Sequence, residues 1–366
     1  MASAGIAKPS FNFVGSSGLR VSNLCLGAMT FGESTLGVPG QCDEHLSHQI
    51  MDRYVELGGN FIDTANVYGQ AGISEKYVGS WMAKRQNRND VVISTKVRFP
   101  VDPNNENGRG LSRRHILQAV EESLQRLQTD YIDIYYIHCW DQGTRIEETL
   151  RTLDDLVRSG KVRYVGASSV TGWQLQKIVE ECRRLGLNPW ICLQAQYSLL
   201  CRSTEFELTD VCRNEGLGLL PWSPLKGGWL TGKVGCSVKP PEGSRLAYVE
   251  ANPERRSTGA WPSYKEFAKD EQVLQLLDIM EKIGKEIGKT MSQIAIRWLL
   301  QKDTVSSVVI GAKTLQQLDD NMGASGWELT QQQMDELDEA SKVEPPYPYE
   351  IITKMGKDRK RENSCR

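Results

Sequence analysis

Asp63, Tyr68, Lys96 and His138 are the residues of this sequence whose types together could do chemistry. A free phenol has a pKa of about 10 and is a poor acid at neutral pH, but a nearby ammonium stabilises the phenolate and lowers that pKa. A carboxylate paired with the ammonium keeps the lysine charged, and an imidazole beside the phenol can orient a carbonyl oxygen. Together the four could deliver a proton to an alkoxide as it forms, which hydride reduction of an aldehyde or ketone requires.

Each of these residues also has an ordinary structural explanation. An aspartate at a strand end often caps a loop, a strand lysine often extends to solvent, and His138 could be a hydrogen-bonded core histidine. Their positions favour a site, because Asp63, Lys96 and His138 lie at or near the ends of three consecutive apolar runs. A strand buried on both faces accommodates a charge only at its end. The pattern therefore predicts that the four residues meet at one rim of a parallel sheet, where active sites of such folds lie.

Strand-like and helix-like segments alternate along the chain after a predicted hairpin at 11–21, which turns at Ser16-Ser17-Gly18. Between the strand-like runs lie segments of helical period, one of them preceded by Ser112 and another followed by Gly160, as helix starts and stops require. No Gly-x-Gly-x-x-Gly follows the first run, which weakens the alternative of an open dinucleotide-binding sheet. Eight strand–helix units predict an α/β fold, a (β/α)8 TIM barrel. The eight runs are 24–29, 61–65, 91–97, 132–138, 162–168, 191–197, 217–223 and 305–312.

We expect residues 1–10 to be a flexible N-terminus, 11–340 a single barrel domain and 341–366 a C-terminal loop and tail. Thr330 to Ser341 has the pattern of one extra helix beyond the eighth unit. The stretch from Lys226 to Ser263 is rich in glycine, proline and charge, and long loops at the strand-end face of a barrel generally shape the substrate site.

The composition is that of an ordinary globular protein, with 39% hydrophobic and 25% charged residues in 366. A net charge of −2 gives no reason to expect nucleic acid as a partner. Nine scattered cysteines without a Cys-x-x-Cys pair indicate reduced thiols in a cytoplasmic protein. No apolar segment is long enough for membrane insertion. His45 and His48 lie on a polar helix face, and we expect solvent rather than a metal there.

Several motifs resemble those of one family, the aldo-keto reductases, over roughly residues 11–340. They are Gly18-Leu19-Arg20-Val21-Ser22, Leu26-Gly27-Ala28-Met29-Thr30-Phe31-Gly32, Asp63 to Gly69, Ser94-Thr95-Lys96, Ile137-His138 with Asp141, Gly160 to Gly166, and Val309-Ile310-Gly311-Ala312-Lys313. The resemblance implies a catalytic tetrad of Asp63, Tyr68, Lys96 and His138, with Tyr68 as the proton donor. It also implies that NADPH (NADP+) lies across the strand-end face.

The resemblance implies cofactor contacts, carried over position by position. Ser168, Ser169 and Gln194 would meet the nicotinamide carboxamide, Trp222 would stack on the ring, and Ser223, Leu225 and Gly227 would line the pyrophosphate. Two positions depart from many relatives: Ser169 replaces an asparagine, and Gln317 replaces an arginine, which leaves Lys313 as the main cation for the 2′-phosphate. The other implied contacts are Gly27, Ala28, Met29, Gly311, Asp320 and Asn321.

Arg98 and Trp140 lie two residues beyond Lys96 and His138, so the strand period aims them at the mouth of the pocket. The alternatives are a solvent-facing arginine and a packed tryptophan. If both face the pocket, they favour planar or anionic carbonyl substrates. Phe31 and Trp229, with Met29, are expected to complete the apolar wall.

Two functions remain in competition at this stage. The first is NADPH-dependent reduction of a small-molecule carbonyl. The second is a cofactor-binding regulatory subunit, because Trp222-Ser223-Pro224-Leu225 and the long loop after it resemble the branch that contains the β subunits of voltage-gated potassium channels and many microbial reductases. The sequence favours the enzyme and leaves homo-oligomerisation open.

Overall fold

The computed structural model describes residues 5–32, 41–235, 239–252 and 264–356. The chain begins with the predicted hairpin, in which β1 (Phe11–Phe13) pairs antiparallel with β2 (Arg20–Ser22). The hairpin contacts the segments that precede β9 and β10, since Ser16 N donates to Gly216 O at 2.8 Å and Asn12 Nδ2 donates to Ser306 O at 3.0 Å. It therefore covers the amino end of the barrel, opposite the predicted site.

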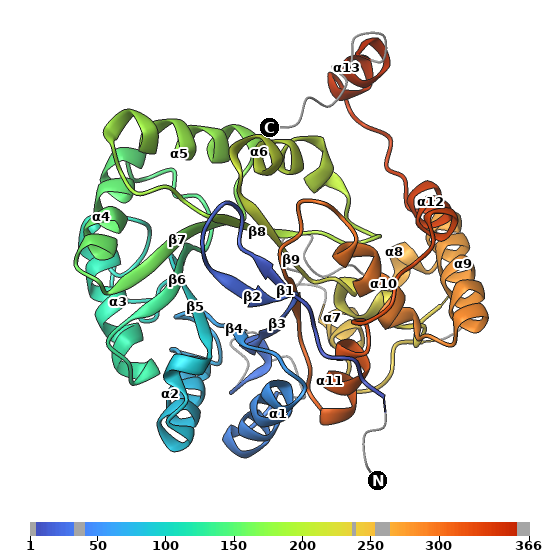
Figure 1. Ribbon diagram of the computed structural model, residues 1–366, viewed down its shortest axis with the longest axis horizontal. Helices are drawn as coiled ribbons and strands as arrows, with labels where there is room; N and C mark the ends of the chain where they lie inside the picture. Colours follow the sequence, from blue (N-terminus) through green and yellow to red (C-terminus); the bar gives the residue numbers. More distant parts are fainter. Residues whose placement is uncertain (1–4, 33–40, 236–238, 253–263, 357–366) are drawn as a thin grey trace.

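Eight parallel strands form the barrel, one for each predicted run (Figure 1). Their order in the sheet is β10-β3-β4-β5-β6-β7-β8-β9, so each strand lies beside its neighbour in sequence. The (β/α)8 prediction is confirmed. The strands are β3 (Leu24–Gly27), β4 (Phe61–Asp63), β5 (Val92–Val97), β6 (Ile132–Ile137), β7 (Val162–Ser168), β8 (Cys192–Gln196), β9 (Gly218–Trp222) and β10 (Val308–Ile310).

The seam between the last two strands closes the barrel near its amino end. Leu219 pairs with Val305 in a parallel bridge, with Leu219 N donating to Thr304 O and Ser306 N donating to Leu219 O, both at 2.9 Å. The carboxyl half of β9 makes its ladder hydrogen bonds with β8, up to the pair of Gln196 and Trp222. The sheet is thus continuous from β10 round to β9 and is joined at this seam by a short contact.

Helices surround the strands on the outside (Figure 1). Side-chain caps start many of them, and Ser112 accepts from His115 N at the start of α3, as predicted. The helices next to the barrel are α1 (Glu44–Glu56), α2 (Ile73–Arg85), α3 (Arg113–Leu127), α4 (Ile146–Arg158), α5 (Gly172–Leu185), α6 (Leu208–Glu215), α10 (Met291–Leu300) and α11 (Leu315–Met322). No helix among the described residues is long and apolar enough to cross a membrane.

Additional helices follow β9 and the eighth unit. The described parts of the long segment after β9 form α7 (Arg245–Ala251), α8 (Tyr264–Phe267) and α9 (Glu271–Ile287), and the predicted extra helix is α12 (Gln331–Ala340). The expected loop after residue 341 contains a helix, α13 (Tyr349–Met355), which that prediction missed. Its three exposed apolar residues, Ile351, Ile352 and Met355, give no burial pattern that would predict a packed helix. The basic run at 357–361 lies outside the described residues.

Tyr54, fully buried on α1, ties together the strands that begin the site. Its hydroxyl lies 2.7 Å from Leu24 O on β3 and 2.9 Å from Phe61 O on β4, and it accepts from Phe61 N at 3.1 Å. Its ring occupies the space that a Cβ at Gly59 would fill, with the nearest ring atom at 2.1 Å. The strand that ends in Asp63 is therefore fixed at its start by one buried hydroxyl.

We predict that Tyr54→Phe lowers the free energy of unfolding by about 1–3 kcal/mol, because it leaves buried backbone groups without their partner. Denaturant unfolding would measure this loss. Tyr131→Phe is the matched control, since the Tyr131 hydroxyl makes only an exposed contact of 3.3 Å with Asn89. Equal stability of both variants and the parent would contradict the role given to Tyr54.

Candidate active site

The centre of the site is a buried ion pair at the carboxyl ends of β4 and β5. Lys96 Nζ donates to Asp63 Oδ2 at 2.5 Å and to Thr64 O at 2.8 Å, with the two side chains 1% and 4% exposed. The other oxygen of Asp63 accepts from Ser94 Oγ at 2.7 Å and from Gln194 Nε2 at 2.9 Å. Both charged groups are therefore paired and hydrogen-bonded, as buried charges must be.

Tyr68 and His138 lie next to this pair. Lys96 Nζ is 5.0 Å from the centroid of the Tyr68 ring, and the Tyr68 and His138 ring centroids are 5.7 Å apart, edge to face. The Phe99 ring also packs edge to face against the imidazole, with centroids 4.9 Å apart. The structure thus brings the four predicted residues together at one rim, from three adjacent strands and the loop after β4.

The electrostatics of the four residues are set by burial and by the ion pair. Burial disfavours the Lys96 ammonium, but Asp63 and Tyr68 outweigh it and hold the pKa of Lys96 above its usual value. Burial lowers the pKa of His138 well below its usual range, and the positive charges of Lys96 and Arg98 add to the effect. His138 is therefore a neutral imidazole at neutral pH, able to hydrogen-bond an oxygen without carrying charge.

The phenol differs from the expectation drawn from its neighbours. Lys96 does act to lower the pKa of Tyr68, but burial acts more strongly in the opposite direction and raises it above the usual value. The phenol consequently stays protonated at neutral pH. An alkoxide is a stronger base than a phenolate, so a protonated Tyr68 can still donate to an oxyanion formed beside it.

The residues expected to meet a nicotinamide lie in or just after β7, β8 and β9. Ser168 Oγ is 3.3 Å from Ser169 Oγ, and Ser168 pairs with Gln194 in the sheet. One amide hydrogen of Gln194 is used by Asp63. Trp222 ends β9 and is half-buried. These groups share the carboxyl rim with the tetrad.

The expected phosphate-binding segment has a backbone suited to close approach of a ligand. Leu225 precedes a short 3-10 segment, η4 (Lys226–Thr231), in which Gly227 and Gly228 take φ of 68° and 111°. Ser223 also has a positive φ, 57°. An added Cβ at Gly228 would meet nothing within 4 Å, so the turn leaves open space on that side. A backbone without side chains there allows its N–H groups to face a phosphate.

The expected adenosine-binding residues follow β10. Lys313 N donates to Gln317 Oε1 at 2.8 Å, and Asn321 Nδ2 donates to Gly311 O at 3.1 Å. Both hydrogen bonds therefore hold the loop after β10 against α11. Asp320 differs, since its carboxylate accepts from Thr290 Oγ1 at 2.9 Å and is already used within the protein. The neighbouring strand β3 ends at Gly27. Of the next two residues, Ala28 is buried and Met29 is 38% exposed.

The expected substrate residues divide into two groups. Arg98 lies near His138, whose pKa its charge affects, and its Nε is buried without a hydrogen-bond partner among the described residues; Trp140 is half-buried beyond the end of β6. Phe31 and Trp229, in contrast, are fully buried. The Trp229 ring stacks on Tyr264 at 5.7 Å. Neither of these two side chains presents an exposed wall, because other side chains of the protein cover them.

Arg245, the first residue of α7, is a candidate that the sequence reasoning missed. Its charge acts on the pKa of both Tyr68 and Lys313, so Arg245 is near the tetrad and near the residues after β10. Burial lowers the pKa of Lys313, and Arg245 adds to that effect. The sequence signal that could have found Arg245 is Ser244, a residue type that often starts a helix, within the long loop predicted to shape the substrate site. In the structure its side chain accepts a hydrogen bond from Ala247 N.

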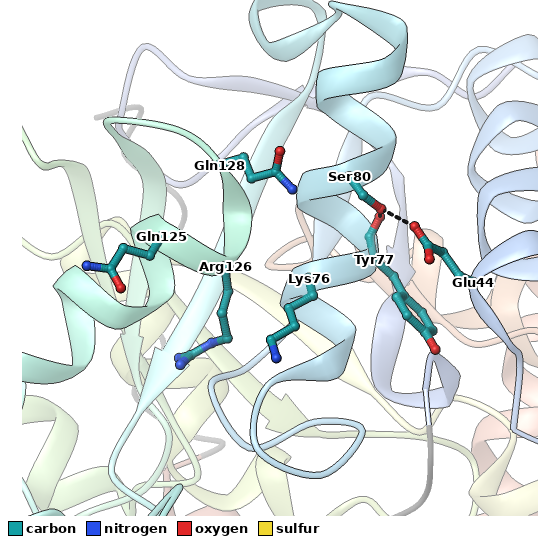
Figure 2. A pocket seen from close by; sticks show the side chains of 7 residues that line it. All are labelled: Glu44, Lys76, Tyr77, Ser80, Gln125, Arg126 and Gln128. Carbon is teal, nitrogen blue, oxygen red and sulfur yellow. Dashed lines mark hydrogen bonds between the residues drawn. The ribbon is translucent and has the colours of Figure 1, made fainter.

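A cavity of about 490 Å³ lies elsewhere, on the outer surface between α2 and the end of α3 (Figure 2). None of the tetrad lines it, so it is not the catalytic pocket. Its lining residues are Glu44, Lys76, Tyr77, Ser80, Gln125, Arg126 and Gln128. Among the described residues, no group of three or more histidine, cysteine, aspartate or glutamate side chains could hold a metal ion.

Comparison with known proteins agrees with the fold. The model of the aldo/keto reductase family matches residues 23–342. The chain is 34% identical over 342 residues to norsolorinic acid reductase of Aspergillus flavus, covering 92% of this chain and 82% of that protein.

Two further relatives differ in their names. Uncharacterized oxidoreductase YrpG of Bacillus subtilis is 37% identical over 321 residues, which cover 86% of this chain and 90% of that protein. Aryl-alcohol dehydrogenase [NADP(+)] of Phanerodontia chrysosporium is 32% identical over 343 residues, which cover 91% and 86%. With the family's match spanning nearly the whole barrel, the chain belongs to the aldo/keto reductase family.

Proposed function

We propose that this oxidoreductase reduces aldehydes and ketones to alcohols with NADPH as the cofactor and Tyr68 as the proton donor. The observation that carries the proposal is the Lys96–Asp63 ion pair beside Tyr68 and the neutral His138 at one rim of the barrel. A structural ion pair would not require a phenol and an unprotonated imidazole on the same side. A carbonyl oxygen placed between those two rings would have a hydrogen-bond partner and a proton source.

The residues at the rim fit a dinucleotide with two phosphates and a third on the ribose. When bound, NADPH supplies the hydride. Ser168, Ser169 and Gln194 would hold its amide, Trp222 would pack on its ring, and the backbone from Ser223 through Leu225 to Gly227 would receive the pyrophosphate. The adenosine end would be held by Gly311, Lys313, Gln317 and Asn321. Asp320 would fix α11 by accepting a hydrogen bond from Thr290, which caps α10.

The protein's own part in the reaction is then proton delivery. Lys96 stays charged because Asp63 faces it, and its field stabilises the phenolate that Tyr68 becomes after donating. His138 orients the carbonyl without competing for the proton, since its low pKa keeps it neutral. Asp63 and Lys96 are buried and Tyr68 and His138 are half-buried, and the resulting partial exclusion of water strengthens these interactions.

We predict that Tyr68→Phe lowers the rate of carbonyl reduction by about 10²–10⁴-fold and leaves NADPH affinity nearly unchanged. The phenol supplies the proton and does not hold the cofactor. Single-turnover kinetics and a cofactor fluorescence titration would measure the two quantities. Tyr131→Phe, at the opposite end of the barrel, is the control. Retention of most of the activity would remove Tyr68 from the role of proton donor, whereas a parent protein that binds NADPH and reduces no carbonyl would favour the regulatory-subunit alternative.

A second prediction concerns the choice of cofactor. Lys313→Ala should weaken NADPH by about one to two decades and leave NADH almost unchanged, because a charge-assisted contact is worth about 1.5–3 kcal/mol and only NADPH carries the 2′-phosphate. Arg245→Gln should lower the affinity for both cofactors, because the Arg245 charge also acts on Tyr68 and would serve the pyrophosphate that NADPH and NADH share. Binding titrations with both cofactors decide this, with the exposed Lys76→Ala as control. Equal losses for Lys313→Ala would place the 2′-phosphate elsewhere.

A third prediction concerns Arg98. Arg98→Ala should raise KM for an aromatic aldehyde that carries a carboxylate by about 10–100-fold and leave benzaldehyde nearly unchanged. The guanidinium lies near His138, and its Nε–H is buried with no hydrogen-bond partner in the part of the chain that the structure describes. Arg98→Lys should restore part of the affinity because it keeps the charge. A uniform loss over both substrates would mean that Arg98 supports the fold instead of the substrate.

A further inference from the structure

Trp173 is an exposed indole at the catalytic rim that the reaction chemistry does not use. It is 59% exposed, although it is the second residue of α5 and follows directly on the loop after β7. Its ring lies edge to face against Trp140, with centroids 5.6 Å apart and an angle of 62° between the planes. An exposed tryptophan of this size is unusual on a surface that only solvent meets.

The pair lies on one side of the reaction centre. Trp140 is two residues beyond His138 and packs partly against the core, while Trp173 follows the strand that ends in Ser168. Trp140 is therefore the inner member of the pair and Trp173 the outer, more exposed one. Together they form an apolar surface that leads outward from the imidazole.

The start of α5 is held from outside the barrel. Gly172 N donates to Glu207 Oε2 at 3.1 Å, and a Cβ at Gly172 would lie 2.4 Å from the Cβ of Glu207. The fit between the backbone before Trp173 and the Glu207 side chain is therefore close enough to require glycine. Movement of Glu207 would move the first turn of α5 and the indole on it.

Glu207 is in turn held by the C-terminal helix. Tyr349, at the start of α13, donates its hydroxyl to Glu207 Oε1 at 2.7 Å, and its ring stacks on Phe206 at 5.4 Å with an angle of 13°. Figure 1 shows α13 standing outside the ring of helices, beyond α6 and α12. The chain thus returns from α12 to contact the segment before α6, whose Glu207 in turn contacts the first residue of α5.

We propose that Trp173 is a specificity-determining residue that, with Trp140, binds the outer ring of planar carbonyl compounds with two or more fused aromatic rings, and that Tyr349 positions it through Glu207. The proposal depends on carbonyl reduction at Tyr68. An aldehyde with one ring, its carbonyl at Tyr68 and His138, ends near the inner indole. Further fused rings extend outward to the edge-to-face pair, where they can stack on one indole and meet the other edge to face.

The first test compares a single-ring and a fused-ring aldehyde, benzaldehyde and anthracene-2-carbaldehyde, with NADPH. Trp173→Ala should raise KM for the fused-ring aldehyde by about threefold to tenfold and leave kcat for both and KM for benzaldehyde unchanged. Trp173→Phe should recover part of the loss because it keeps an aromatic face. Phe13→Ala, which removes an aromatic residue 57% exposed at the amino end of the barrel, is the control.

The second test addresses positioning. Tyr349→Ala should raise KM for the fused-ring aldehyde as Trp173→Ala does. Tyr349→Phe should raise it less, because the stack on Phe206 remains. The double variant Tyr349→Ala, Trp173→Ala should have the same KM as Trp173→Ala alone. A merely structural role would give additive losses or lower kcat for both substrates, and either result would overturn the positioning by Tyr349.

The outcomes separate this inference from the proposed function. If the parent protein reduces neither aldehyde, carbonyl reduction itself fails. If it reduces both, and Trp173→Ala changes KM for both equally or for neither, carbonyl reduction stands and Trp173 has no part in selecting the substrate.

Discussion

The buried ion pair of Asp63 and Lys96 is the constraint on which the arrangement of the site depends. Removing two charges from water costs several kcal/mol per ion, which is regained only when both are paired and hydrogen-bonded. Here that requires Ser94 on β5, Gln194 on β8 and the carbonyl of Thr64. The pair forms only if Asp63 lies opposite Ser94 in the parallel ladder, because a shift by one residue would turn Lys96 away from it. Strand register and site geometry are therefore one requirement.

Most of the fold follows from the sequence because strand ends and helix starts leave local signals. All eight barrel strands lie within the predicted runs, and the hairpin and the helix after Thr330 form as expected. The meeting of Asp63, Lys96 and His138 at one rim was predictable for the same reason, since charged or polar residues that end apolar runs have few other positions, and Tyr68 follows on the loop after Asp63. The C-terminal helix gave no such signal, because its apolar residues face outward.

What the sequence could not give is the balance of opposing effects at buried positions. The ammonium beside Tyr68 predicts a lowered pKa, yet burial, which no local pattern reveals, reverses the direction. The sequence predicts that Trp229 lines the substrate pocket, but Tyr264 and Phe267, more than 30 residues further along the chain, pack against its ring. Arg245 comes close to Tyr68 and Lys313 only because a long segment folds back over the rim. Each of these outcomes depends on contacts between parts of the chain far apart in sequence.

The short seam between β9 and β10 has a consequence for the dynamics of the barrel. Its backbone hydrogen bonds gather around Leu219, near the amino end, so the carboxyl half of the seam has few bonds to break when it separates. Local opening events of lowest free energy are therefore expected there, and amides of β10 should exchange with solvent faster than those of β6. A ligand lying across the rim from Trp222 to Lys313 would bridge that junction and slow its opening.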